Sequence, residues 1–323
     1  LITGHTGFKG SWLLSWLLKL GANIVGISND IPTEPAMFEV LNESNQIKDL
    51  RFCITNIDLL KSTILEEEPD FIFHLAAQPI VSKSYLNPHY TIMSNVLGTT
   101  NLLESLRFFK KECKVIIITS DKCYDNIETL WGYKETDKMG GKDIYSASKG
   151  AAELIIKSYF ESFFKNNIFI KIGIARAGNV IGGGDWGDNR LLPDLIRNFS
   201  SGQKMTVRNP ASTRPLQHVL DPLSGYISAL EAILNDEKIT SINFGPDTKS
   251  IAVSEVVEVA VKNNAFNIGY IDGAGDKLPE ALVELGANVT HLTAADLSLD
   301  KLKGFDAIVV GIRAYNMYEF LTD

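Results

Sequence analysis

Two stretches of the chain, FIFHLAA (residues 71–77) and KVIIIT (residues 114–119), are almost continuously apolar. A strand with one face in water alternates polar and apolar residues, whereas a continuous apolar run suits a strand buried on both faces. Further short apolar runs lie at residues 1–3, 24–27 and 168–175. Amphipathic helical patterns lie between the runs, at residues 10–20, 59–67, 91–109 and 146–164. This alternation predicts an α/β fold, a doubly wound parallel Rossmann sheet with helices on both faces.

The composition excludes several classes of protein. A chain of 323 residues with 45% hydrophobic and 22% charged residues fits a globular protein of about two domains. The net charge of −8 argues against nucleic acid or an anionic membrane as partner. Cys53, Cys113 and Cys123 form no C-x-x-C pair, so we expect neither disulfides nor zinc, and a location in the reducing cytosol. Five histidines without an H-E-x-x-H pattern predict no metal site.

Neither a signal peptide nor a membrane span is expected. The apolar run SWLLSWLL (residues 11–18) is short and follows a glycine-rich turn, so we interpret it as a packed helix. No apolar run approaches the roughly 20 residues that a spanning helix needs. The sequence begins with Leu1 inside a predicted strand, so we expect further residues upstream of it.

A glycine-rich turn, GHTGFKG, stands between the first predicted strand and the first predicted helix. Gly4, Gly7 and Gly10 would let the backbone approach a pyrophosphate that rests on the helix N-terminus. This position favours a dinucleotide site over a glycine turn that binds nothing. Ser28 ends the second strand and Asp30 follows it, and either could contact the adenosine ribose. No basic residue occurs in GISNDIP (residues 26–32), which favours NAD over NADP.

The motif YSASK places Tyr145 and Lys149 four residues apart, on one face of a predicted helix. An ammonium near a phenol favours the phenolate and lowers the pKa of the phenol, so the tyrosine can act as a general base near neutral pH. Alone, this spacing often arises by chance. Downstream of the glycine turn and of a strand that ends at Ser120, it indicates a catalytic pair.

The strand in KVIIITSDKCYDN delivers Asp121 and Lys122 at its carboxyl end, the edge where parallel sheets bind ligands. Taken alone, a solvated turn with an incidental ion pair explains these residues equally well. The motifs around them favour a second acid–base pair beside Tyr145 and Lys149.

Six blocks of sequence together resemble the extended branch of the short-chain dehydrogenase/reductase superfamily, and within it the CDP-glucose 4,6-dehydratases. They are TGHTGFKGSWL, FHLAAQPIVSKSY, TSDKCYDN, WGYKETDKMGGKDIYSASKGAAEL, ARAGNVIGGGDWGDNRLLPDLIR and RPLQHVLDPLSGY, across about residues 1–250. The resemblance implies a lyase that converts CDP-glucose to CDP-4-keto-6-deoxyglucose by internal hydride transfer from C4 to C6 on bound NAD. It also implies a homodimer, formed through helices 91–109 and 146–164, in deoxysugar and O-antigen biosynthesis.

The resemblance implies a role for each catalytic residue. Tyr145 would deprotonate the C4 hydroxyl, Ser120 would hydrogen-bond the C4 oxygen, and Lys149 would hold the nicotinamide ribose. Lys122 would be the base at C5, and Asp121 the acid that protonates the leaving C6 hydroxyl. The dTDP-glucose and GDP-mannose branches carry glutamate where this chain has Lys122, and a lysine base needs a lowered pKa.

The resemblance also assigns residues to the cofactor and to the substrate. The cofactor residues are Gly4, Thr6, Gly7, Phe8, Gly10, Ser28, Asn56, Ile57, Leu75, Ala76, Ala77, Asn95, Tyr145 and Lys149. The substrate residues are Gln78, Asn179, Arg190, Arg208, Arg214 and His218. Arg176 is a further candidate cation for the diphosphate, since bidentate arginine suits phosphate. We favour Arg214 and Arg190 over Arg208, and His218 could equally be structural.

We expect three segments. They are a NAD-binding Rossmann domain (1–175), a nucleotide-sugar-binding part interleaved with it (176–264) and an atypical α/β segment (265–323). The last segment predicts strands at 268–271, 289–292 and 307–311, and helices at 277–285 and 299–302. Residues 266–316 resemble a C-terminal piece of PIG-L (LmbE-like) deacetylases, without the zinc-binding His-Pro-Asp-Asp motif. The hypothesis of a chimeric chain follows.

Two other functions stay open. A related nucleotide-sugar epimerase or reductase would share the fold, but its reaction needs no acid–base pair like Asp121 and Lys122. A non-catalytic NAD-binding chimera would suit the atypical C-terminal segment. Binding alone needs no Ser120, Tyr145 and Lys149, so the residues favour an enzyme.

Overall fold

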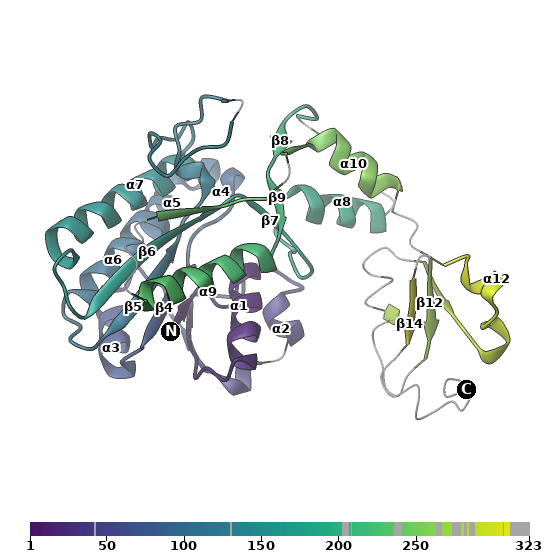
Figure 1. Ribbon diagram of the computed structural model, residues 1–323, viewed down its shortest axis with the longest axis horizontal. Helices are drawn as coiled ribbons and strands as arrows, with labels where there is room; N and C mark the ends of the chain where they lie inside the picture. The colour runs from purple at the N-terminus through teal and green to yellow at the C-terminus, as the bar shows by residue number, and fades with distance from the viewer. Residues whose placement is uncertain are drawn as a thin grey trace. The chain divides into compact units, whose positions relative to one another are not determined.

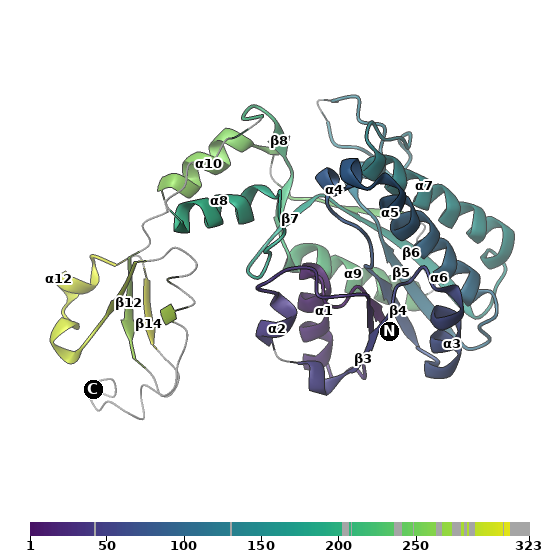
Figure 2. The same cartoon turned by 180° about the vertical axis from the view of Figure 1, so that it is seen from behind.

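The largest sheet of the structure, a computed structural model, has seven parallel strands (Figures 1 and 2). The structure describes residues 1–41, 43–129, 131–201, 207, 209–235, 241–247, 249–262, 267–272, 279–280, 283, 288–305 and 307–310. The chain divides into two units, and each is described by itself. The first comprises residues 1–189 and 214–250, and the second residues 190–213 and 251–323.

The strands of the first unit follow the order β10-β6-β5-β4-β1-β2-β3, all parallel. They are β1 (Ile2–Thr3), β2 (Val25–Ser28), β3 (Lys48–Arg51), β4 (Phe71–His74), β5 (Cys113–Ile118), β6 (Ile170–Ala177) and β10 (Ser241–Phe244). The strand order reverses between β1 and β4, and doubly wound sheets bind ligands at the carboxyl ends of strands beside such a reversal. The predicted Rossmann-type architecture is confirmed.

Helices cover both faces of this sheet (Figures 1 and 2). One face carries α3 (Ile57–Glu67), α6 (Gly98–Leu106) and α7 (Ile144–Tyr159), and the other α1 (Phe8–Lys19) and α9 (Leu220–Leu234). Strand β5 shows why its sequence is continuously apolar. Val115 and Ile117 pack into the core under α3, α6 and α7, while Ile116 and Ile118 pack into the core under α1 and α9.

Shorter elements complete the first unit. They are α2 (Met37–Leu41), α4 (Val81–Leu86), α5 (Pro88–Ile92), β7 (Asn179–Ile181), β9 (Leu216–His218), the 3-10 turns Ser44–Gln46 and Asp121–Cys123, and the π-helical segments Met93–Leu97 and Phe160–Phe164. Strand β7 pairs with β9 in a separate small sheet. The helix predicted over 91–109 is therefore α5, a π-helical turn and α6 in succession. The helix predicted over 146–164 is α7 followed by the second π-helical segment.

Local sequence explains several boundaries. The side chain of Asp143 caps α7 by accepting a hydrogen bond from the amide of Ser146. Asn87 caps α5, and Pro88 occupies the first position of that helix, where it gives up no intrahelical hydrogen bond. Strand β3, with the polar sequence KDLR, lies at the edge of the sheet, which is why no apolar run marks it.

The second unit contains α8 (Leu191–Ser200), α10 (Val253–Lys262) and a three-stranded parallel sheet. A short pairing joins β8 (Thr213–Arg214) to β11 (Ile251–Ala252). The parallel sheet has the order β13-β12-β14 and consists of β12 (Asn267–Ile271), β13 (Asn288–His291) and β14 (Ala307–Val310). A 3-10 turn (Ala294–Asp296) and α12 (Leu299–Leu302) lie between β13 and β14 along the chain. The three predicted strands and the short helix of this segment are confirmed. Most of the helix predicted over 277–285 lies outside the described residues.

Candidate active site

The glycine turn leads from β1 into α1 at the carboxyl edge of the sheet. Gly4 has φ +77°, and a Cβ there would lie 2.7 Å from the amide nitrogen of Ala76, in the loop after β4. A Cβ on Gly10 would lie 2.0 Å from the carbonyl oxygen of Gly4. Both positions therefore require glycine for the turn and for the packing of α1 against it.

The third glycine of the turn has a different environment. Gly7 is the N-cap of α1, and no side chain caps this helix end. A Cβ on Gly7 would meet only the oxygen of Gly4, at 3.4 Å, so the space above this end of the helix is open on that side. Uncapped amides of a twelve-residue helix beside an open glycine position fit the pyrophosphate of a dinucleotide. Of the predicted cofactor residues, Leu75, Ala76 and Ala77 form the facing loop after β4.

Hydrogen bonds fix the glycine turn to the ends of β2 and β3. Thr6 Oγ1 donates to the carbonyl oxygen of Asp30 at 2.6 Å, and the amide of Thr6 donates to Ser28 Oγ at 3.4 Å. The ring of His5 is fully buried and contacts Ser28 Oγ (Nδ1, 3.0 Å) and Asp49 Oδ1 (Nε2, 3.0 Å). Burial lowers the pKa of His5, against the opposing attraction of Asp49. Ser28 is thus engaged within the protein, whereas Asp30 is exposed.

The predicted cofactor residues Asn56 and Ile57 lie at the start of α3. Asn56 accepts a hydrogen bond from the amide of Leu59 at 3.2 Å and so acts as the N-cap of that helix. Ile57 is 36% exposed beside it. Both lie after β3, on the same edge of the sheet as the glycine turn.

Ser120, Asp121 and Lys122 form a short hydrogen-bonded set directly after β5. Ser120 Oγ donates to Asp121 Oδ1 at 2.9 Å and accepts from the amide of Lys122 at 3.2 Å. Lys122 Nζ donates to Asp121 Oδ2 at 3.2 Å. The side chains of Asp121 and Lys122 are 31% and 42% exposed, so a ligand can reach both charged groups.

Helix α7 carries Tyr145 and Lys149 on its buried face, against the turn that contains Asp121. A Cβ on Gly150 would lie 2.8 Å from the oxygen of Gly140 and 3.2 Å from that of Cys123, so the helix approaches the backbone after β5 closely. Burial lowers the pKa of Lys149 to about 8, while Glu153 and Cys123 act in the opposite direction. The structure thus brings the tyrosine–lysine pair and the Ser120–Lys122 segment together.

Two predicted ligands make hydrogen bonds inside the protein. Asn95, in the first π-helical segment, accepts from the amide of Gln78 at 2.7 Å and donates to Ser148 Oγ at 2.9 Å. The side chain of Gln78 donates from Nε2 to Thr91 Oγ1, and its Oε1 accepts from the backbone amide of Ile80. The π-helical turn occurs where Asn95 reaches across to the β4 loop, and Ser148 in turn bonds to the carbonyl oxygen of Tyr145. Their predicted contacts with cofactor and substrate stay predictions.

Arg176 is not available to bind a diphosphate, so the prediction of Arg176 as a candidate cation for the substrate diphosphate is wrong. The side chain, on β6, is 3% exposed and forms two parallel hydrogen bonds of 2.8 Å with the carboxylate of Glu153. The remaining nitrogen donates to the hydroxyl of Tyr124 and to the carbonyl oxygen of Glu135. Burial opposes the charge of Arg176, but Glu153 outweighs it and the pKa of the guanidinium is raised.

The remaining predicted substrate residues are divided between the two units. Asn179, Arg214 and His218 belong to the first unit, and Arg190 to the second. Asn179 begins β7, which pairs with β9, the strand that ends at His218. His218 is exposed, and its Nδ1 accepts from the amide of Leu220 at 3.3 Å. Arg208 lies outside the described residues.

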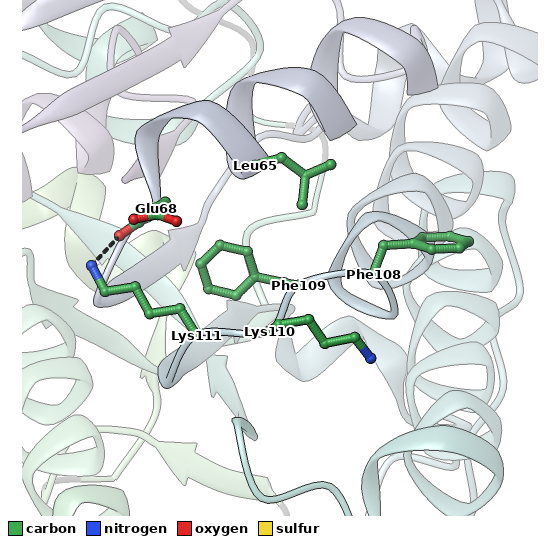
Figure 3. Close-up of a pocket in the computed structure, with 6 residues that line it drawn as sticks. All are labelled: Leu65, Glu68, Phe108, Phe109, Lys110 and Lys111. Atoms are coloured by element: carbon green, nitrogen blue, oxygen red, sulfur yellow. Dashed lines mark hydrogen bonds between the residues drawn. The ribbon is translucent and has the colours of Figure 1, made fainter.

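A pocket of about 330 Å³ (Figure 3) lies at the amino-terminal ends of the strands, the edge of the seven-stranded sheet opposite the glycine turn. Its lining comprises Leu65, Glu68, Phe108, Phe109, Lys110 and Lys111, from the segments that precede β4 and β5. Lys111 Nζ donates to the carbonyl oxygen of Glu68 at 3.1 Å across it. Because ligands of such sheets bind at the carboxyl ends of the strands, this pocket does not belong to the candidate active site.

Within the part of the chain that the structure describes, no three His, Cys, Asp or Glu side chains gather into a possible metal site. The three cysteines are free thiols. Among the described helices, none combines the length and the apolar character needed to cross a membrane.

Several known proteins are similar to this chain in sequence or in fold. The GDP-mannose 4,6 dehydratase family matches residues 1–281. The chain belongs to this family. A CDP-glucose 4,6-dehydratase of Salmonella typhimurium is 45% identical over 259 residues, which cover 77% of this chain and 72% of that protein. The predicted membership in the 4,6-dehydratases, and with it an enzyme of the hydro-lyase type, is confirmed.

Solved structures of low sequence identity share the fold. The dTDP-glucose 4,6-dehydratase DesIV of Streptomyces venezuelae, solved with NAD and TYD bound, has a TM-score of 0.71 and 18% identity, over 81% of this chain and 80% of that one. The UDP-glucose 4-epimerase of Thermus thermophilus, solved with NAD, has a TM-score of 0.69 and 23% identity, over 81% of both chains. These likenesses support the doubly wound architecture.

Proposed function

We propose that this protein is a NAD-dependent 4,6-dehydratase that converts CDP-glucose to CDP-4-keto-6-deoxyglucose. One observation carries the proposal: a chain 45% identical to a CDP-glucose 4,6-dehydratase holds Asp121 and Lys122, paired and accessible, beside the helix of Tyr145 and Lys149. An epimerase or a simple reductase of this fold would need only the latter pair together with Ser120.

The residues divide the reaction between two acid–base sets. Tyr145 takes the proton of the C4 hydroxyl, and Ser120 hydrogen-bonds the same oxygen. Lys122 then removes the C5 proton, which the C4 ketone has made acidic, and Asp121 gives a proton to the departing C6 hydroxyl. Lys122 Nζ donates to Asp121 Oδ2 at 3.2 Å, so the two groups lie together as ammonium and carboxylate. One proton must pass from Lys122 to Asp121 before Lys122 can act as the base and Asp121 as the acid. Bound NAD would supply the hydride acceptor for C4 and the hydride donor for C6, so no external reductant would be consumed.

The chain offers a binding surface for NAD. The open N-terminus of α1 at Gly7 would receive the pyrophosphate, and Leu75, Ala76 and Ala77 would flank it from the loop after β4. Lys149 would hold the nicotinamide ribose. Ser28 is engaged by His5 and Thr6, so Asp30 suits the adenosine ribose better.

The substrate diphosphate needs cations, and we propose Arg214 of the first unit for this role. Arg190 and Arg208 stay predictions from the sequence. Asn179, Gln78 and His218 would complete the nucleotide-sugar site. Arg176 is excluded by its pair with Glu153.

The test is incubation with CDP-glucose and NAD in heavy water, with mass spectrometry of the product. Loss of water together with gain of one deuterium is expected, because C5 exchanges its proton through Lys122. GDP-mannose and dTDP-glucose serve as controls for the nucleotide. An epimerised sugar of unchanged mass would show an epimerase instead. Bound NAD without any product would show a non-catalytic binding protein.

We also propose a homodimer formed through residues 91–109 and 146–164, which comprise the end of α5, the first π-helical segment, α6, and α7 with its π-helical extension. Large apolar side chains are exposed along these two segments, namely Ile92, Phe108, Leu154 and Phe163. Sedimentation of the wild type at twice the chain mass, and of Leu154→Glu at a lower mass, would support this interface. A monomeric wild type would contradict it. The proposed dimer is cytoplasmic and acts in deoxysugar synthesis for O-antigen.

The C-terminal segment is proposed to have another origin than the rest of the chain. The CDP-glucose 4,6-dehydratase match covers 77% of the chain, and the sheet β13-β12-β14 is separate from the seven-stranded sheet. A piece of a PIG-L-type protein joined near residue 265 would account for both, and the family match to residue 281 runs a little past that junction. Sequencing the source DNA across this junction tests it, since an uninterrupted dehydratase sequence there would exclude a chimera.

A further inference from the structure

A buried ion pair lies directly behind the candidate catalytic residues. Glu153 is 2% exposed and stands four residues after Lys149 on α7, and Arg176 lies on β6 with 3% exposure. Two hydrogen bonds of 2.8 Å join them in the planar bidentate geometry that suits guanidinium and carboxylate. The proposed mechanism gives neither residue a task. Removal of one partner would leave the other as an uncompensated buried charge.

Glu153 also connects α7 to the end of β5. Thr119, the residue before Ser120, donates from Oγ1 to Glu153 Oε1 at 2.5 Å. Through this contact, one carboxylate joins the helix that carries Tyr145 to the backbone that delivers Ser120.

Arg176 extends the connection to the chain after Lys122. Its Nη1 donates to the hydroxyl of Tyr124 at 2.6 Å and to the carbonyl oxygen of Glu135 at 3.1 Å. Tyr124 in turn donates to Asn243 Oδ1 on β10, at 2.7 Å. The guanidinium therefore ties the segment between Lys122 and α7 to β6 and α7, and the Tyr124 hydroxyl ties it to β10.

Charge gives the pair a second task. Besides Tyr145, which shares a face of α7 with Lys149, the buried titratable groups that act on Lys149 are Glu153 on its own helix, Cys123 after β5 and His74 on β4. Burial raises the pKa of the Cys123 thiol to about 12 and lowers that of His74 to about 3, so both are neutral near pH 7. Arg176, on β6, is cationic and bound to Glu153. The carboxylate of Glu153 is thus the charge in this group that favours an ammonium at Lys149.

We propose that Glu153 and Arg176 are a positioning pair for proton transfer, which fixes α7 against the end of β5 and keeps Lys149 charged. This role rests on the proposed dehydratase activity. It predicts that the pair controls the alkaline limit of the reaction as well as its rate.

The test compares the pH profile of kcat for wild type and for Glu153→Gln, which keeps the shape and removes the charge. The alkaline limb should move to lower pH by about one unit, and kcat at pH 9 should fall at least about tenfold. KM for CDP-glucose should change less than about twofold, because the pair touches no substrate atom. Glu153→Asp, which retains the charge, should lose kcat but keep the alkaline limb of the wild type.

Glu161→Gln is the matched control, because Glu161 forms an exposed ion pair with Lys165 in the π-helical extension of α7. This variant should keep the rate and pH profile of the wild type. Thr119→Val is a milder probe that removes the hydrogen bond to Glu153 without adding or deleting a charge. Its kcat should fall about threefold or more, with an unmoved alkaline limb.

Competitive acetylation of Lys149, followed by mass spectrometry over pH, measures the titration of this lysine without turnover. A folded Glu153→Gln variant with the kcat, alkaline limb and acetylation profile of the wild type would overturn the proposal. Should that variant not fold, wild-type kcat in both Thr119→Val and Glu153→Asp would overturn it. An inactive wild type would instead contradict the proposed dehydratase, and the acetylation profiles would still test the effect of Glu153 on Lys149.

Discussion

Lys122 Nζ lies 3.2 Å from Oδ2 of Asp121, its neighbour in sequence, at the carboxyl end of β5. Half-exposed ion pairs of this kind contribute little to stability, typically about 0–1 kcal/mol. Their accessibility instead leaves both groups able to meet a ligand. A pair with little structural value at the ligand-binding edge of the sheet suits a catalytic task.

Substitution of this pair separates chemistry from folding. Lys122→Met and Asp121→Asn should each lower kcat for dehydration by about 10²–10⁴, since each removes one proton transfer. The free energy of unfolding should change by less than about 1 kcal/mol. Dehydration rates and urea denaturation measure the two effects. Lys122→Met should also lose deuterium incorporation at C5, and wild-type incorporation in this variant would refute a base role for Lys122.

The glycine turn gives a second prediction, because its glycines meet different surroundings. Gly10→Ala places a Cβ 2.0 Å from the oxygen of Gly4 and should destabilise the protein by a few kcal/mol, on the order of other overpacked sites. Gly7→Ala meets only an oxygen at 3.4 Å and should fold almost normally. Its methyl group would crowd the place proposed for the pyrophosphate, so NAD affinity should fall about tenfold or more. Calorimetric titration of NAD decides this, and Gly7→Ala with unaltered affinity would place the pyrophosphate elsewhere.

Sequence patterns predicted the features that depend only on residues close together in the chain. The continuous apolar run of β5, the four-residue spacing of Tyr145 and Lys149, and the strands of the C-terminal sheet all follow from short-range rules. Contacts between distant segments were not predictable in this way. Arg176 looked like a phosphate ligand because nothing in its own sequence block shows that it lies against Glu153. A signal was present in retrospect, since Glu153 continues the Tyr145–Lys149 face by one more helical turn.

The lowered pKa of Lys149 predicts a gain in stability when its charge is removed. Burial brings this pKa from 10.5 to about 8. The unfolded chain therefore binds more protons between pH 8 and 10.5, and the cost of the buried ammonium, about 3 kcal/mol, is fully present below pH 8. Lys149→Met should be inactive but more stable than the wild type at pH 7, and the gain should shrink as pH rises through 8 to 10.5. Lys157→Met, at an exposed position of the same helix, is the control in urea denaturation. A destabilised Lys149→Met variant at pH 7 would contradict the prediction.

The burial of His74 predicts that the folded protein loses stability as the pH falls. Its ring lies between Thr3 Oγ1 (2.7 Å) and Thr99 Oγ1 (3.2 Å) in the core, and burial, with Lys149 nearby, lowers its pKa to about 3. The unfolded chain, with a histidine pKa near 6.5, binds the extra proton between pH 6.5 and 3, so stability falls as pH decreases through this window. His74 alone should make the protein about 2 kcal/mol less stable at pH 5 than at pH 7. His74→Gln should lose this part of the slope, while the exposed His89→Gln should keep it. Urea denaturation of the three proteins from pH 5 to 7.5 measures the difference, and parallel slopes for wild type and His74→Gln would show that His74 is protonated in the folded state.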